Sequence, residues 1–377
     1  MKLHGVTHTL QFLSCDSTNS NTGWRAGILA WLEKLVGRKM TWLICQLHTN
    51  ELGLRHLFEI LDGKTNSKTG WSGPLGKLLK SVDTMERNYT FEKINVGPGL
   101  IKLTPEVISD LSTDQSQFYQ LVQAVYSGHL SRELALRKTG NMVHSRWLTF
   151  AEAVLLLWMS KHKLTGELLQ RLKTVVTYIV SLYGPMWFEI KVKHSWLVGP
   201  RHVLNHLVLL RLQSTEVQKI LLPYLRTSSW YAHSEAILQT MLCSQDSKER
   251  DFAVSKILKI RGKNDAGRTE PRKRKLPELN ENATILQDLI KWDGAEEPLL
   301  TCHLTRQDIK EFKDTSMKVP YYCGHTQPIE RAIKEVTAAC SAVYGEERRD
   351  GWIRARASNR EIMPLCNTKR DLLGLLA

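Results

Sequence analysis

The stretch LQFLSCDSTNSNTG, residues 10–23, is an apolar run that ends on a single aspartate, Asp16, and continues into serine, threonine, asparagine and glycine. A second apolar run, TWLICQLH at residues 41–48, closes in the same way on His48. Both runs are typical of strands, and the residues between them, 24–36, carry apolar side chains at helical spacing. The sequence therefore predicts a βαβ unit with two parallel strands.

The predicted strands of this unit cover 8–16 and 41–47, and Gly37 is a suitable C-cap for the helix between them. The expected apolar face of that helix consists of Trp24, Ile28, Trp31, Leu32 and Leu35. Open parallel sheets place their chemistry beyond the carboxyl ends of the strands. We therefore expect Asp16 and His48 at the same edge of the sheet.

The composition indicates a folded protein. Of the 377 residues 42% are hydrophobic and 11 are tryptophan, which allows a sizeable core. No apolar run approaches the roughly 18–20 residues of a membrane span, so no membrane partner is expected. The seven cysteines follow no framework spacing, which favours reduced thiols and an intracellular location.

The positive charge is concentrated in one part of the chain. Half of the net charge of +14 lies in residues 250–275, which contain ten lysines and arginines and three acidic residues. The run PRKRK, residues 271–275, predicts either a nuclear-localisation signal or a phosphate-contacting loop, and a solvated linker is the alternative. The candidate DNA-binding residues of this run are Arg272, Lys273, Arg274 and Lys275.

Helical patterns dominate after the first unit, with a loop expected over 62–76. Helices are predicted from Thr104 and over 115–127, 149–160, 164–182, 201–212, 215–225, 233–243 and 248–260, with Gly128 and Gly262 as stops. A last amphipathic helix begins at Thr326, carries Glu330 in its first turn and ends at Gly345. We predict three regions: a partial α/β unit over 1–61, a helical domain over 62–318 with a basic linker at 262–282, and a C-terminal region over 319–377.

Four short motifs follow one another in the order that is found in a known family. CDSTN at 15–19, CQLH at 45–48, SRWLT at 145–149 and TQPIERAI at 326–333 resemble the motifs of hAT-type DDE transposases. That family has an RNase H-like catalytic fold split by a long helical insertion. The resemblance therefore implies the fold class, an α/β remnant of an RNase H-like fold with a large, mostly α-helical insertion.

The resemblance also implies roles for individual residues. Asp16 and Glu330 would hold Mg²⁺ or Mn²⁺ for phosphodiester chemistry. His48 would contact DNA near the scissile phosphate, Trp147 would stack on a base at the cleaved end, and Arg146 would contact phosphate or brace the insertion. DNA is the implied partner, the nucleus the implied location, and a homo-oligomer the implied assembly.

Each candidate residue also has a purely structural interpretation. Asp16 could form an Asx turn with Thr18 or cap the following helix, and Trp147 could be a core anchor. Glu330 is a natural first-turn acid, and Cys45 on an apolar strand is usually a buried small hydrophobe. A rival zinc site would use Cys45, His48, Cys302, His303, Cys323 and His325, although their spacings match no finger or ribbon.

A first catalytic aspartate is missing from the pattern, because residues 1–15 contain no aspartate or glutamate. The resemblance thus implies a transposon-derived protein, either an N-terminally truncated copy or a domesticated derivative, that is catalytically incomplete and could retain residual DNA binding. The competing hypothesis is a non-catalytic helical interaction protein whose basic run is a localisation signal.

Overall fold

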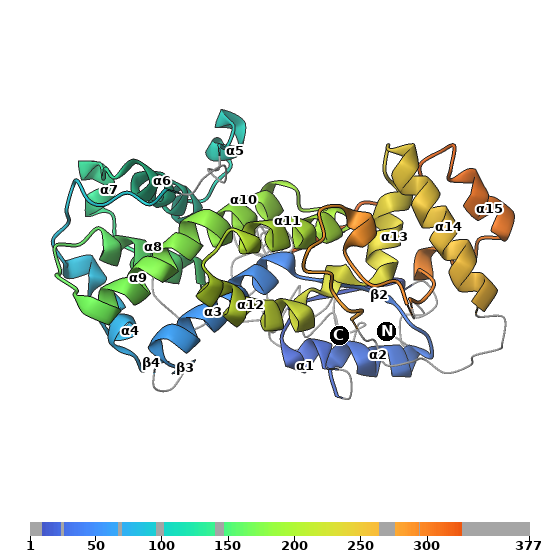
Figure 1. The fold of residues 1–377 in the computed structure, drawn as a ribbon, viewed down its shortest axis with the longest axis horizontal. Helices are drawn as coiled ribbons and strands as arrows, with labels where there is room; N and C mark the ends of the chain where they lie inside the picture. Colours follow the sequence, from blue (N-terminus) through green and yellow to red (C-terminus); the bar gives the residue numbers. More distant parts are fainter. Residues whose placement is uncertain are drawn as a thin grey trace, which may run out of the picture. The chain divides into compact units, whose positions relative to one another are not determined.

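The computed structural model of the chain describes residues 10–23, 26–66, 70–95, 102–139, 147–263, 276–293 and 295–325 (Figure 1). The chain divides into two compact units, one made of Met1–Leu43 with His325–Ala377 and the other of Ile44–Gly324. It is mostly helical, with one small parallel sheet. No helix within the described ranges is both long and apolar enough to cross a membrane.

The first unit contains the predicted βαβ arrangement. Its elements are β1 (Phe12–Cys15), α1 (Asn19–Thr22), α2 (Ile28–Val36) and β2 (Thr41–Ile44). β1 pairs with β2, and the Thr41 N–H donates to the Gln11 carbonyl at 2.9 Å. Gly37 caps α2 with a left-handed φ of 76° and donates to the Glu33 carbonyl, so the predicted helix stop is confirmed.

The predicted apolar face of the first-unit helix is largely exposed. Leu29 is the buried residue of α2, with 2% of its surface exposed. Ile28, Trp31 and Leu35 are 53%, 60% and 40% exposed, and Trp24 lies outside the described residues. The periodicity identified an amphipathic helix, but it could not show which side of that helix is covered.

The second unit contains most of the predicted helices. The helices α6 (Thr113–Ser127), α8 (Trp147–Trp158), α9 (Gly166–Tyr178), α11 (Gly199–Arg211), α12 (Thr215–Ser228), α13 (Ser234–Leu242) and α14 (Ser247–Lys263) lie within a few residues of their predicted positions. Short helices are α4 (Pro74–Leu79), α5 (Pro105–Ser109), α7 (Arg132–Leu136) and α15 (Arg306–Glu311). Single 3₁₀ turns are η2 (Val82–Thr84), η5 (Trp196–Val198), η6 (Trp230–Ala232), η7 (Leu286–Asp288) and η8 (Leu299–Thr301). Gly128 ends α6 with a φ of 77°, as predicted, whereas Gly262 lies inside α14.

A long helix that the sequence analysis missed opens this unit. α3 (Gln46–Asp62) begins two residues after β2, so the CQLH motif forms a helix start instead of a strand end. Its buried residues include Leu47, Leu54 and Leu61, which share one face at seven-residue spacing. The preceding apolar run concealed the start, because TWLICQL satisfies both the strand and the buried-helix pattern.

The predicted loop over 62–76 is also structured. It holds a hairpin of β3 (Thr65–Asn66) and β4 (Gly70–Trp71), followed by the start of α4. The carboxylate of Asp62 accepts the N–H groups of Leu75 and Gly76, at 2.9 and 2.7 Å. Asp62 therefore caps α4 from the end of α3, although it lies twelve residues before the helix starts.

A break in helical geometry separates two helices that would otherwise be continuous. A π-helical turn, η4 (Ile179–Tyr183), connects α9 to α10 (Gly184–Val192). Pro185 has no N–H for the bond that an α-helix needs at this point, which accounts for the wider turn. The predicted helix over 164–182 ended inside this π turn, and the sequence analysis did not predict α10.

The core of the second unit lies between α3, α6, α8, α9 and α10 (Figure 1). Four rings form an aromatic cluster, Phe58, Trp71, Trp147 and Phe150, with centroid separations between 4.7 and 5.6 Å for the pairs in contact. Aromatic pairs of this kind each contribute about 0.5–1.5 kcal/mol beyond their buried area. The cluster ties α3, β4 and α8 together.

Candidate functional site

Asp16 follows β1, and its carboxylate stabilises the local turn. Oδ1 accepts hydrogen bonds from the Thr18 N–H at 2.9 Å, the Thr18 hydroxyl at 2.6 Å and the Asn21 side-chain amide at 2.7 Å. The alternative interpretation, an Asx turn with Thr18, is therefore confirmed. A metal-ligand role for Asp16 stays a prediction.

The second predicted ligand, Glu330, lies outside the described residues. In the part of the chain that the structure describes, no three histidine, cysteine, aspartate or glutamate side chains gather as a metal site. The rival zinc set of Cys45, His48, Cys302, His303, Cys323 and His325 is therefore not brought together there. Mg²⁺ or Mn²⁺ binding by Asp16 and Glu330 is not tested by this observation.

His48 lies in the first turn of α3 with a quarter of its side chain exposed. Its Nδ1 is 3.9 Å from a carboxylate oxygen of Glu51, one turn further along the helix. Cys45 is buried directly before the helix. A contact of His48 with DNA stays a prediction, because its side chain is partly accessible.

Trp147 begins α8 but faces the interior. Only 2% of its surface is exposed, and its ring lies 5.6 Å from Trp71 and 4.8 Å from Phe150, between centroids. This packing favours the core-anchor interpretation over base stacking, since a ring that stacks on a base must have one face accessible to it. Arg146, its predicted neighbour at the DNA, lies outside the described residues.

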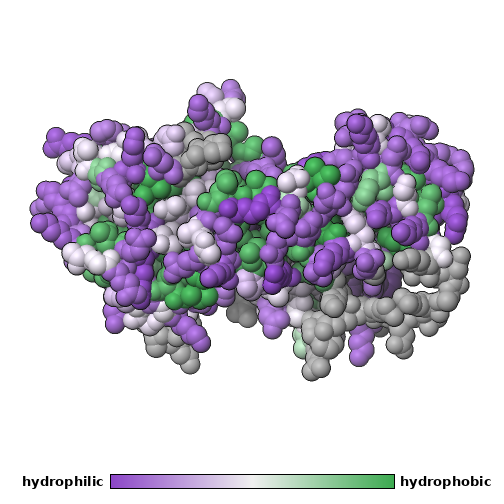
Figure 2. All heavy atoms as spheres, in the orientation of Figure 1, coloured by the Kyte–Doolittle hydropathy of each residue, from purple (hydrophilic) through white to green (hydrophobic). Residues whose placement is uncertain are grey.

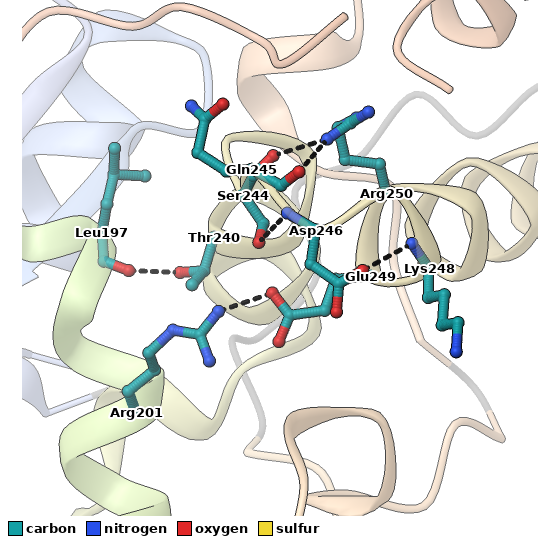
Figure 3. Close-up of polar contacts among 9 residues, drawn as sticks. All are labelled: Leu197, Arg201, Thr240, Ser244, Gln245, Asp246, Lys248, Glu249 and Arg250. Atoms are coloured by element: carbon teal, nitrogen blue, oxygen red, sulfur yellow. Dashed lines mark hydrogen bonds and ion pairs between the residues drawn. The ribbon is translucent and has the colours of Figure 1, made fainter. Parts of the chain in front are cut away.

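Two of the ten basic residues over 250–275 have structural roles. Arg250 is 7% exposed and donates to the carbonyls of Ser244, Gln245, Phe312 and Lys313 at 2.9–3.3 Å. Figure 3 shows the contacts with Ser244 and Gln245. Arg261 donates to the carbonyls of Thr301 and Leu304 and pairs with Glu297. These guanidinium groups bind groups of the protein itself, so they are not available to phosphate.

The remaining described basic residues of α14 lie on its outer side. Lys248 and Lys259 are exposed, and the ammonium group of Lys256 lies 5.2 Å from the ring centroid of Phe252 and 5.7 Å from that of Trp292. Hydrophilic residues predominate over α14 and α15 on the face drawn in Figure 2. Arg272, Lys273, Arg274 and Lys275 lie outside the described residues. We call the group of Lys248, Phe252, Lys256, Lys259 and Trp292 the α14 face.

A second feature is a cavity of about 40 Å³ in the second unit, which we call the α11 cavity and whose lining surface is mostly apolar. Its lining includes Gln46 and Asn50 from α3 and His202 and His206 from α11. Burial lowers the pKa of His202 and lowers that of His206 to about 4, so both imidazoles are neutral at pH 7. The volume has room for a few water molecules or a single ion.

The sequence analysis passed over all four of these residues. Gln46 lies between Cys45 and His48, the two residues that the motif had singled out. His202 and His206 are four residues apart in a predicted helix, a spacing that places two side chains on one face. That spacing was the available signal for the histidines, whereas nothing local marks Gln46 as buried.

No protein-family model, curated protein or solved structure matches this chain. Its residues and their geometry therefore provide the only basis for a function.

Proposed function

We propose that this chain is a transposon-derived protein, hAT transposase-like, that binds DNA through the α14 face and the basic run 271–275 and does not cleave it. The observation that supports this best is the α14 face itself. Its Lys256 lies over the rings of Phe252 and Trp292, and the basic run 271–275 follows the helix closely in the sequence. Lysines interleaved with aromatic rings are the usual composition of nucleic-acid surfaces.

The distribution of positive charge is the first support for DNA binding. The net charge of +14 gives the whole chain an attraction for phosphate. Within 250–275, eight basic residues remain once Arg250 and Arg261 are set aside, because those two bind carbonyl groups. The run 271–275 also supports a nuclear location for this function.

The transposase origin is supported by the motif order and by the βαβ arrangement, with Asp16 at the end of the first strand. Cleavage is not part of the proposal, since the Asp16 Oδ1 atom is already held by three hydrogen bonds in its own turn. Mg²⁺ or Mn²⁺ would bind only if a further acidic side chain joined Asp16 and Glu330 in one site.

The test is the salt dependence of duplex binding, measured by fluorescence anisotropy at several salt concentrations. Each phosphate contact contributes about 0.9 to the slope of log affinity against log salt. We expect the double variant Lys256→Gln/Lys259→Gln to lower that slope by about 2 and to weaken binding at every duplex sequence.

A matched control is the double variant Lys161→Gln/Lys173→Gln, which removes the same charge from lysines paired with Glu86 and Glu92. Its slope should stay close to that of the unchanged protein. Equal losses in both variants would show that only net charge matters, and the α14 face would then have no special part. Absence of duplex binding at low salt would refute the proposal altogether.

An interaction protein is the second candidate function, and the exposed apolar residues of α2 favour it. Ile28, Trp31 and Leu35 lie on neighbouring turns and are each at least 40% exposed. Clustered exposed apolar side chains mark protein contacts.

If a second copy of the chain covers these residues, the protein should self-associate in a concentration-dependent way in sedimentation velocity. Trp31→Ser should abolish this self-association, whereas Ser20→Ala in α1 should not. A monomer at all concentrations would exclude this contact.

A further inference from the structure

A group of exposed lysines lies on the β3–β4 hairpin and α4, apart from the α14 face. Lys64 comes directly before β3, Lys77 lies on α4, and Lys80 is the residue at which α4 ends. All three side chains are exposed, and Lys68 of the same segment lies outside the described residues. We call Lys64, Lys77 and Lys80 the hairpin surface.

The backbone of the hairpin and of α4 brings these lysines into one region. The ammonium nitrogen of Lys80 lies 3.4 Å from the position that a Cβ atom would take at Gly70, the first residue of β4. Burial raises the pKa of the Asp62 carboxyl at the end of α3, and the charge of Lys77 opposes this shift, so Lys77 lies near Asp62. Lys64 follows Asp62 by two residues. The three lysines therefore lie around the base of one hairpin.

The acidic residues near the hairpin surface bind other groups. Asp62 is 5% exposed and caps α4 with its carboxylate. Glu59 pairs with Arg55 at 3.0 Å, and Asp83 accepts hydrogen bonds from the N–H and the hydroxyl of Thr139. No ion pair joins a lysine of the hairpin surface to another described residue. Their three charges are therefore available to a partner.

The side chains around these lysines favour phosphate as that partner. Trp71, Leu75 and Leu79 are buried, and among the described residues of 64–80 no large apolar side chain is exposed. Proteins that lie on a membrane surface combine basic residues with an exposed apolar face, which is not found in this region. Contacts to a nucleic-acid backbone need the positive charge alone.

We propose that the hairpin surface is a second binding surface for the phosphate backbone of nucleic acid, separate from the α14 face. Figure 1 shows β3, β4 and α4 at one end of the second unit and α14 at the other. The hairpin surface binds without sequence preference, because lysines that contact phosphate do not read base edges. This binding depends on its own residues and does not require the α14 face to bind DNA.

The experiment uses the full chain carrying Lys256→Gln/Lys259→Gln, in which the α14 face is weakened, and a short duplex at low salt. We expect residual duplex binding in fluorescence anisotropy. Adding Lys77→Gln/Lys80→Gln should weaken that binding about tenfold and lower the slope of log affinity against log salt by about 2, since two phosphate contacts are lost. The loss should be the same for duplexes of different sequence.

The matched control adds Lys161→Gln/Lys173→Gln to the same background, because these lysines are paired with Glu86 and Glu92. Equal losses in the two combined variants would overturn the proposal, and so would the absence of residual binding in the background variant. Polyglutamate that displaces the duplex as readily as unlabelled duplex of equal charge would show that the surface fits an acidic protein, which also overturns it. Failure of the α14 face is a separate result, since Lys256→Gln/Lys259→Gln alone would then leave duplex binding unchanged.

Discussion

Replacing Glu152 with glutamine is expected to raise the free energy of unfolding at pH 9 by up to about 5 kcal/mol, and by less than about 1 kcal/mol at pH 5. Glu152 lies in α8 with 1% of its surface exposed, and its Oε1 has no partner among the described residues. Burial, with smaller contributions from Asp114 and Asp83, raises the pKa of this carboxyl from 4.5 to about 8.

The sign of the effect follows from proton binding. Between pH 4.5 and 8 the folded protein holds a proton on Glu152 that the unfolded chain has released. The stability contributed by the protonated carboxyl is therefore fully present below pH 4.5 and is lost as the pH rises through 8. The rise of the Glu152 pKa from 4.5 to about 8 corresponds to about 5 kcal/mol, and glutamine, which does not titrate, removes this loss.

Urea unfolding at pH 5, 7 and 9 measures the effect. Glu167→Gln is the control, because Glu167 is exposed and pairs with Arg171 on its own helix. That change should alter stability by less than about 1 kcal/mol at each pH. Parallel pH profiles for Glu152→Gln and the unchanged protein would show that Glu152 is ionised in the fold, contrary to the prediction.

Arg250→Met is expected to lower the free energy of unfolding by about 3–5 kcal/mol, although methionine fills a similar volume. The guanidinium joins the turn after α13 to the segment after α15. It donates to Ser244 and Gln245 on one side (Figure 3) and to Phe312 and Lys313 on the other. Without it, four carbonyls lose a donor in a mostly buried position. Lysine should rescue only part of the loss, since one ammonium group lacks the planar fork of arginine.

Arg226→Met provides the comparison in the same urea measurements. The Arg226 side chain is 56% exposed and pairs with Glu281. Its loss should change stability by less than about 1 kcal/mol. If both variants lost the same amount, the buried carbonyl contacts of Arg250 would contribute no more than an exposed ion pair.

Much of the helical architecture could be predicted because its signals are local. Helices such as α6 and α12 appear where apolar residues recur at helical spacing, and Gly37 and Gly128 stop helices because a residue without Cβ adopts positive φ readily. α3 was missed because its local signals are misleading. Its first residues continue an apolar strand, and no capping side chain marks its start.

The roles of the candidate site residues could be predicted less well from local patterns. Trp147 begins a helix in a motif that resembles a DNA-contacting one, yet Trp71 and Phe150 bury it. Arg250 and Lys259 contribute equally to a charge count, but the first binds carbonyls and the second faces solvent. Such differences depend on partners far away in the chain.

The sequence by itself determined the βαβ start, the positions of most helices and the concentration of positive charge, because spacing and turn chemistry act over a few residues. Only the tertiary structure decided that Asp16 serves its own turn, that Trp147 is a core residue, and that Gln46 and Asn50 share a cavity with two histidines about 150 residues away. The physical reason is that burial and hydrogen-bond partners are properties of packed surfaces, which bring together residues that no local pattern connects.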